Sequence, residues 1–181
     1  MAHLPLWYIS QVPPDQVLKA HEEFKAYDKK AASMDIDGNT LDKEHRDTTV
    51  SFINKDHWFG LQMFNFVSLA NRECKWGYHL EDHEAVQYAE YGSKQHYNWH
   101  TDFFPLSGKD YDRKITVVCL LNDPSEFEGG DFEIRMRSTF KAPLEKGTII
   151  AFPSILEHRV VPITSGLRCS ATMWVNGPRF R

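Results

Sequence analysis

Cysteine is scarce in this sequence and is never paired in a motif. Cys74, Cys119 and Cys169 are the three cysteines among 181 residues, and they are widely spaced. An odd number without a Cys-x-x-Cys pair argues against a disulfide framework, a thiolate zinc site and a dithiol redox centre. We expect reduced cysteines that pack in the interior, and a cytoplasmic location.

Long apolar runs and an excess of basic charge are also missing. The longest apolar runs, such as Val117 to Leu121, have the length of a strand, so no transmembrane helix is expected. The first residues lack the basic head and apolar stretch of a signal peptide. The formal charge is −4, and lysines and arginines are scattered among acidic residues. This pattern argues against a membrane or nucleic acid as a partner and leaves the oligomeric state open.

The length and composition are those of one globular domain. With 41% hydrophobic and 25% charged residues, the chain can bury a sizeable core. We predict a single domain over residues 1–181, with a support region of helices and strands at 1–85 and a β-rich core at 86–176. No linker or internal repeat divides the two regions.

The support region contains two helical patterns. The first begins at Pro14-Asp15 and runs to about Lys30, and the second is expected to be capped by Asp56. Alternating residues at 48–53 predict a half-buried strand. The polar segment 31–46 predicts an exposed loop.

From Val86 onward the sequence consists of short strand-like runs separated by Gly, Pro and Asp turns. Such a density of short strands predicts a sandwich or a barrel. The expected strands are 86–91, 114–121, 131–137, 147–152, 158–163 and 169–175.

His100-Thr101-Asp102 is a candidate pair of metal ligands. In an extended segment, residues two apart point to the same face, as two ligands of one metal must. The pair alone is weak evidence, because His45-Arg46-Asp47 has the same spacing at the end of a polar loop.

A second histidine downstream completes the set. His158 lies in another predicted strand, and two histidines with one carboxylate form a facial triad, which suits iron(II) because coordination positions stay open. A single histidine on a strand is more often a hydrogen-bonded core residue. Arg168 and Ser170 favour the functional reading, since they share one strand face and can hold a carboxylate.

These residues form part of an ordered set of motifs. The set is Tyr91, Tyr97-Asn98-Trp99-His100-Thr101-Asp102, Leu121-Asn122-Asp123-Pro124, Glu128-Gly129-Gly130-Asp131-Phe132, Gly147 to Pro153, His158-Arg159-Val160, Gly166-Leu167-Arg168 and Trp174. Over about 86–174 the sequence resembles the 2-oxoglutarate and iron(II)-dependent dioxygenases, specifically the prolyl 4-hydroxylase-like group with its PKHD-type hydroxylases. The resemblance implies an α+β, mainly β fold: a double-stranded β-helix, or jelly roll, with N-terminal helices packed on one sheet.

The resemblance also implies roles for individual residues. His100, Asp102 and His158 would bind Fe(II), while Arg168 and Ser170 would bind the far carboxylate of 2-oxoglutarate. Tyr91 would hydrogen-bond this co-substrate, although an aromatic that only fills the barrel explains it equally well. O2 is the second co-substrate, with ascorbate as an optional reductant. The Gly129-Gly130 turn is expected to be structural.

Four further side chains are candidates for contact with the substrate: Tyr97, Trp99, Arg113 and Trp174. Packing at the barrel mouth is the alternative explanation for each of them. Segments 31–46 and 104–112 are candidate lids that become ordered on substrate binding.

The activity implied is hydroxylation of an unactivated carbon, with a prolyl residue in a peptide or protein as the favoured substrate and succinate and CO2 as by-products. Two positions favour the PKHD-like branch. Arg168 stands where collagen-type enzymes have lysine, and Leu120 stands where oxygen-sensing enzymes have tyrosine. Alternatives are a hydroxylase of a free amino acid or small metabolite, a cupin-like metalloenzyme that does not use 2-oxoglutarate, and a jelly-roll binding module without catalysis.

Overall fold

The computed structural model describes residues 5–32, 42–104 and 108–180. Its helices are α1 (Pro14–Phe24), α2 (Trp58–Glu73) and the 3-10 helix η1 (Pro124–Glu126). The strands of the first half are β1 (Tyr8–Gln11), β2 (Lys30–Ala31), β3 (Arg46–Asp47), β4 (Thr49–Phe52) and β5 (Asp82–His83). Those of the second half are β6 (Gln87–Tyr91), β7 (His96–His100), β8 (Tyr111–Leu120), β9 (Phe127–Gly129), β10 (Phe132–Arg135), β11 (Thr139–Lys141), β12 (Thr148–Pro153), β13 (Glu157–Val160), β14 (Ile163–Gly166) and β15 (Arg168–Pro178).

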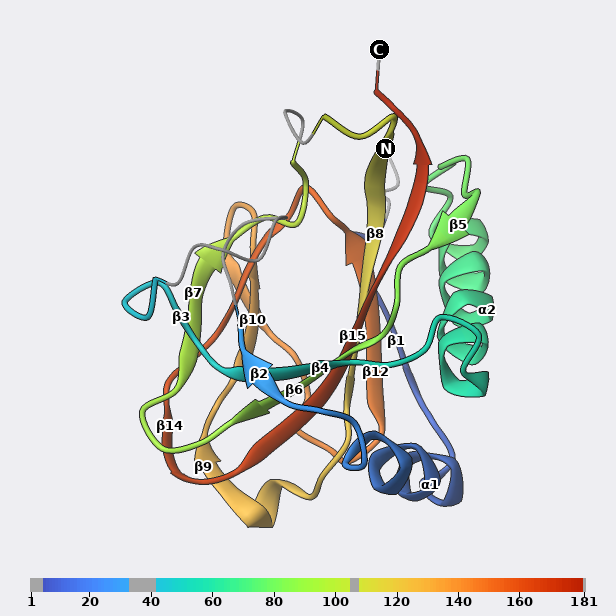
Figure 1. Ribbon diagram of the computed structural model, residues 1–181. Helices are drawn as coiled ribbons and strands as arrows, with labels where there is room; N and C mark the ends of the chain where they lie inside the picture. Colours follow the sequence, from blue (N-terminus) through green and yellow to red (C-terminus); the bar gives the residue numbers. More distant parts are fainter. Residues whose placement is uncertain (1–4, 33–41, 105–107, 181) are drawn as a thin grey trace.

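Two antiparallel sheets make up most of the molecule. The major sheet has the order β1-β12-β8-β15-β6-β4-β2, with β5 paired to β15, and the minor sheet has the order β11-β10-β13-β7-β3. In Figure 1 the minor sheet lies to the left of the major sheet, and the pair β14-β9 closes the lower end between them. Except for the hairpin β10-β11, most paired strands are not consecutive in sequence, as in β1-β12, β8-β15 and β15-β6, which is expected for the predicted jelly roll.

Side chains alternate between the two faces of the central strands of the major sheet, and they contribute to two hydrophobic cores. In β15 the residues Cys169, Ala171, Met173 and Val175 face one hydrophobic cluster, while the residues between them face the space between the sheets. β8 and β12 alternate in the same way. Because both faces of these strands are covered, they are almost entirely buried.

The hydrophobic cluster that contains Cys169, Ala171, Met173 and Val175 is covered by the two α-helices. α1 and α2 lie on the side of the major sheet that faces away from the minor sheet (Figure 1), and α2 contacts β8, β12 and β15. Apolar residues at helical spacing, such as Val17 and Phe24 in α1, are fully buried there. The predicted fold, a mainly β jelly roll with N-terminal helices on one sheet, is confirmed. The three cysteines are free and buried.

Both helix boundaries differ from the prediction. α1 ends at Phe24 and not near Lys30, because the chain turns there to pair Lys30 with Val50 in the major sheet. The N-cap of α2 is His57 and not Asp56. His57 Nδ1 accepts a hydrogen bond from the amide of Phe59, which an acceptor at the N-cap must do.

The strand expected at 158–163 is divided in two. β13 pairs within the minor sheet, whereas β14 pairs with β9, and Pro162 lies between them. Proline has no amide hydrogen to donate between strands, so the chain leaves the minor sheet here and enters the two-stranded β14-β9 sheet.

The predicted exposed loop and lids fall partly on residues that are not described. Residues 33–41 of the first segment and 105–107 of the second lie outside the described ranges. At the edges of the first segment, Lys30–Ala31 and Arg46–Asp47 are strands, so these edges are not loop. Within the described residues, no helix has the length and apolar character needed to cross a membrane.

Candidate functional site

Three side chains with metal-binding atoms meet between the two sheets. His100 ends β7, Asp102 follows two residues later, and His158 lies opposite His100 in β13. Each side chain offers one potential ligand atom, and these three atoms lie within 4.8 Å of one another. Asp102 Oδ2 is 3.2 Å from His158 Nε2, and Asp102 Oδ1 is 3.8 Å from His100 Nε2. The structure therefore brings together the three residues that the sequence selected as ligands.

The backbone orients the two imidazole rings. His100 Nδ1 is 2.7 Å from the carbonyl oxygen of Asn98, and His158 Nδ1 is 3.0 Å from that of Leu156. A carbonyl oxygen only accepts hydrogen bonds, so Nδ1 carries the proton in both rings. Each Nε2 then points toward the cluster and is the atom that would coordinate a metal ion.

Asp102 is held as a carboxylate by its surroundings. It is buried, and its Oδ2 accepts a hydrogen bond from Thr116 Oγ1 at 2.8 Å. Thr116 Oγ1 is in turn 3.0 Å from Ser154 Oγ, and the Asp102 amide donates to the Ser154 carbonyl. Burial raises the pKa of Asp102, but the nearby His158 and His100 outweigh it and hold the pKa well below its usual range.

His100 is stacked in a column of side chains. The Tyr97 ring lies parallel to the His100 ring, with centroids 3.4 Å apart, and the Arg46 guanidinium lies 4.5 Å from the Tyr97 centroid. Burial, followed by the charge of His158, lowers the pKa of His100 to about 3. The ring is therefore neutral near pH 7. Arg46 comes from the second His-x-Asp pair, which contributes to the site by stacking and not by a metal ligand.

Arg168 lines the same cavity between the sheets as His100, Asp102 and His158. Its side chain is 2% exposed, and Nη1 donates to Ser170 Oγ at 3.1 Å. Within the described residues Nε has no hydrogen-bond partner, and no carboxylate forms an ion pair with the guanidinium. Tyr91 is the register partner of Arg168, with its ring 5.8 Å from the guanidinium carbon. Burial lowers the pKa of Arg168.

Gly130 leaves the space that Arg168 occupies. Its φ is +67°, and a Cβ atom there would lie 2.9 Å from Arg168 Cδ and would also collide with Ile163. Only glycine combines this backbone angle with so close an approach. The predicted structural turn thus also shapes the arginine pocket.

The metal-ligand candidates and Arg168 line one cavity, and Trp174 lines it too. Its lining combines both sheets: Gln87, Tyr91, Tyr97, His100, Asp102, Val118, Phe132, His158, Val160, Arg168, Ser170, Thr172 and Trp174. The Trp174 Nε1 donor is buried and has no hydrogen-bond partner in the described part of the chain. Trp174 is thus placed as a wall of the cavity.

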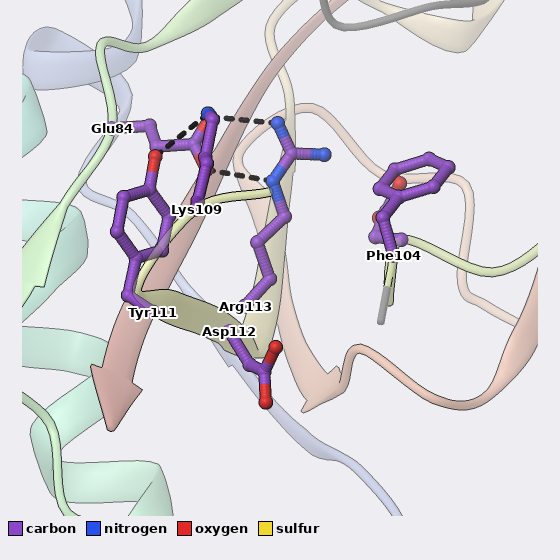
Figure 2. A pocket seen from close by; sticks show the side chains of 7 residues that line it. Glu84, Phe104, Lys109, Tyr111, Asp112 and Arg113 are labelled. Carbon is purple, nitrogen blue, oxygen red and sulfur yellow. Dashed lines mark hydrogen bonds and ion pairs between the residues drawn. The ribbon is translucent and has the colours of Figure 1, made fainter. Parts of the chain in front are cut away.

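A second pocket adjoins Asp102 and contains Arg113. Figure 2 shows the Glu84 carboxylate facing the Arg113 guanidinium and the Phe104 ring on the other side. Arg113 donates two hydrogen bonds to Glu84, at 2.7 and 2.6 Å, and its guanidinium carbon lies 3.8 Å from the Trp174 ring centroid. Arg113 is therefore fixed beside the cavity, with its charge already paired.

Trp99 is not brought to the cavity. Its ring contacts the guanidinium groups of Arg135 and Arg159, whose partners are Glu157 and Glu133 on the same sheet. An extra residue in β7 places Tyr97 opposite Val160 while His100 lies opposite His158. This bulge puts Tyr97 on the same face as His100 and leaves Trp99 on the outer face.

Sequence reasoning did not identify Thr116, Ser154 or Asn122 as parts of the site. Thr116 has a recognisable signal, since it is a polar residue within an apolar strand, at a position that alternation assigns to the inner face. Ser154 had no such signal. Asn122 belongs to the Leu121-Asn122-Asp123-Pro124 motif, but nothing in the sequence assigns it a contact.

Solved structures with the same fold include two that are named as prolyl hydroxylases. One is a prolyl-4-hydroxylase from Pseudomonas putida, with a TM-score of 0.71 and 18% identity, covering 95% of this chain and 93% of that one. Another is a viral collagen prolyl hydroxylase from Paramecium Bursaria Chlorella virus-1, with a TM-score of 0.69 and 18% identity, covering 96% and 97%. At this identity the likeness concerns the fold alone.

Curated relatives are more similar in sequence over a shorter region. A PKHD-type hydroxylase from Picosynechococcus sp. is 37% identical over 91 residues, which cover 49% of this chain and 40% of the relative. A PKHD-type hydroxylase from Crocosphaera subtropica is 28% identical over 100 residues, covering 54% and 45%. Each match thus spans less than half of the relative.

The profile of one protein family matches the region that carries the site. It is described as the 2OG-Fe(II) oxygenase superfamily, and it matches residues 86–176, half of the chain. This range includes the histidine and aspartate cluster and Arg168 with its cavity. The chain therefore belongs to the 2OG-Fe(II) oxygenase superfamily.

Proposed function

We propose that this protein is an Fe(II)- and 2-oxoglutarate-dependent dioxygenase that hydroxylates an unactivated carbon, and that its substrate is a prolyl residue in a peptide or protein. His100, Asp102 and His158 would hold the metal. Arg168 and Ser170 would hold the far carboxylate of 2-oxoglutarate, with Tyr91 beside them.

The observation that carries this proposal is the buried state of Arg168. A guanidinium removed from water without an anionic partner is costly, and a bound carboxylate would offset that cost through charge-assisted hydrogen bonds. Its Nε is a donor without a partner among the described residues, and Ser170 adds a hydroxyl beside it. A cupin-like enzyme that does not use 2-oxoglutarate would have no use for this arginine.

The donor set fits Fe(II). Two imidazoles direct Nε2 toward an ionised carboxylate, and a cation between them would be bound by all three groups. Three protein ligands also leave positions for a chelating co-substrate and O2. When bound, the iron would supply the oxidation of 2-oxoglutarate and a substrate C–H by O2, giving succinate, CO2 and the hydroxylated product.

The chain's own residues would bind, orient and exclude water. Arg168 would fix the position of the co-substrate, and Val118, Phe132 and Val160 add apolar surface to the lining of the same cavity. Thr116 orients the Asp102 carboxylate.

Trp174 and Arg113, beside the residues that would hold the metal, favour a substrate with an uncharged ring. The charge of Arg113 is paired with Glu84, so what Arg113 and Trp174 offer together is a flat stacked surface. A pyrrolidine ring suits such a surface better than the carboxylate of a free amino acid does. The similar folds bearing the name prolyl hydroxylase support the same substrate class.

The test is succinate formation from 2-oxoglutarate, with anaerobically loaded Fe(II), O2 and a panel of proline-containing peptides. We expect peptide-stimulated succinate and a peptide 16 Da heavier. His100→Ala should abolish both products, and Arg168→Ala should raise the KM for 2-oxoglutarate by at least tenfold.

Each negative result has a distinct meaning. No succinate from protein shown to bind iron would refute 2-oxoglutarate chemistry and favour the cupin-like alternative. Succinate stimulated by free amino acids but not by peptides would refute the prolyl peptide and retain the dioxygenase.

A further inference from the structure

Arg168 stands at the point where one of its neighbouring strands ends. On one side β15 pairs with β6, with Arg168 opposite Tyr91. On the other side the pairing with β8 begins only at Ser170, opposite Leu120. Continuing that register would place residue 122 opposite Arg168, but β8 has already ended there. The backbone around Arg168 therefore lacks a strand on this side.

The side chain of Asn122 takes the place of the missing strand. Its Nδ2 donates to the Leu167 carbonyl at 2.7 Å, and its Oδ1 accepts from the Cys169 amide at 2.7 Å. These are the two backbone groups on either side of Arg168. Asn122 is 2% exposed, its bond to the Cys169 amide is buried, and its bond to the Leu167 carbonyl is partly buried, so competition by solvent is reduced.

We infer that Asn122 is a positioning residue for 2-oxoglutarate binding. It does not reach the cavity, and it acts by fixing the backbone from which the Arg168 side chain projects. The need for this clamp follows from the length of the arginine side chain, since a small rotation at its Cα is amplified at the guanidinium.

The direction of the two bonds makes the assignment specific to asparagine. An aspartate would lose the donor to Leu167, and a leucine would remove the partner of the buried Cys169 amide as well as that of the Leu167 carbonyl. The inference rests on the proposed function, because it concerns the binding of the same co-substrate.

The chain offers a matched control for this clamp. Asn71 makes the same two kinds of bond to backbone, with Nδ2 donating to the Tyr78 carbonyl at 2.8 Å and Oδ1 accepting from the Tyr78 amide at 3.1 Å. It lies in α2, which covers the face of the major sheet that is turned away from the minor sheet (Figure 1), and no residue of α2 lines the cavity. Asn71→Ala therefore removes an equivalent pair of bonds without touching Arg168.

The experiment is calorimetric titration of the Mn(II)-loaded full chain with 2-oxoglutarate and with 2-oxopentanoate, which has the same length but lacks the far carboxylate. We expect Asn122→Ala to weaken 2-oxoglutarate binding about tenfold and 2-oxopentanoate binding less than twofold. Asn71→Ala should change neither. In turnover, Asn122→Ala should raise the KM for 2-oxoglutarate and leave kcat at saturation within about twofold.

Equal weakening of both ligands in Asn122→Ala, or unchanged binding of both, would overturn the inference while the proposed function stands. If wild-type protein bound no 2-oxoglutarate, the proposed function would fail, and this inference with it. Should the alanine variant not fold, as judged by circular dichroism and Mn(II) binding, Asn122→Ser is measured against the same criteria.

Discussion

The hydroxyl of Thr116 donates a 2.8 Å hydrogen bond to Oδ2 of Asp102 in the interior of the barrel. Both side chains are buried, and Ser154 is in contact with the same hydroxyl at 3.0 Å. One carboxylate oxygen is thus occupied and the orientation of the other is restricted. A carboxylate oriented in this way loses less rotational freedom when it binds a metal ion.

Replacing Thr116 with valine should therefore weaken metal binding. Valine preserves the volume and removes the hydroxyl, so we expect Mn(II) affinity to fall by about tenfold, measured by calorimetric titration. Thr48→Val is the control, since the buried Thr48 hydroxyl bonds to the Glu90 carbonyl and not to a metal ligand. Equal affinity of Thr116→Val and wild type would show that the hydroxyl does not orient the ligand.

Metal binding should stabilise the folded chain through the three predicted ligands. A hundredfold excess of Mn(II) over its Kd should raise the free energy of unfolding by about 2.7 kcal/mol. His158→Ala and Asp102→Ala should lose this increase, and a chelator should reverse it. His45→Ala, from the second His-x-Asp pair, should keep it. Stabilisation of His158→Ala by Mn(II) equal to that of the wild type would place the metal elsewhere.

Gly130→Ala should disturb the arginine pocket. The added methyl group meets Arg168 and Ile163 at a positive φ, so we expect a loss of stability of about 1–3 kcal/mol and a raised KM for 2-oxoglutarate. Gly77→Ala is the matched control, because Gly77 has φ +73° with nothing within 4 Å of an added Cβ. It should lose stability from strain alone and keep the wild-type KM. A wild-type KM in Gly130→Ala would contradict the prediction.

Acid should destabilise the protein partly through His21. Burial, followed by the charge of Lys25, lowers the pKa of His21 below its ordinary value near 6.5, and its Nε2 is 3.2 Å from the buried Tyr88 hydroxyl. Below about pH 6.5 the unfolded chain therefore binds more protons than the folded one, and the free energy of unfolding falls as the pH decreases.

His21→Gln should make this loss between pH 7 and pH 5.5 smaller, as measured by urea denaturation of chelator-treated protein. His79→Gln is the control, because it removes a histidine whose side chain is exposed. An identical pH dependence in His21→Gln and wild type would exclude His21 as the titrating group.

The sequence by itself determined the parts of the site that lie close together along one strand. Arg168 and Ser170 are two residues apart, and the period of a strand puts them on one face whatever the rest of the fold does. The same spacing selected His100 and Asp102, and the density of short strands indicated a barrel. Short-range periodicity is a property of the backbone, so these features need no tertiary information.

Tertiary structure decided which residues of different strands meet, and which face a strand presents after an irregularity. A bulge in β7 separates Trp99 from Tyr97, although alternation puts them on the same face. Asn122 reaches the backbone on either side of Arg168 only because β8 ends beside it, and Thr116 reaches Asp102 only because β8 and the segment after β7 come together in the fold. Register and bulges are set by packing between segments far apart in the chain, so local periodicity does not predict them.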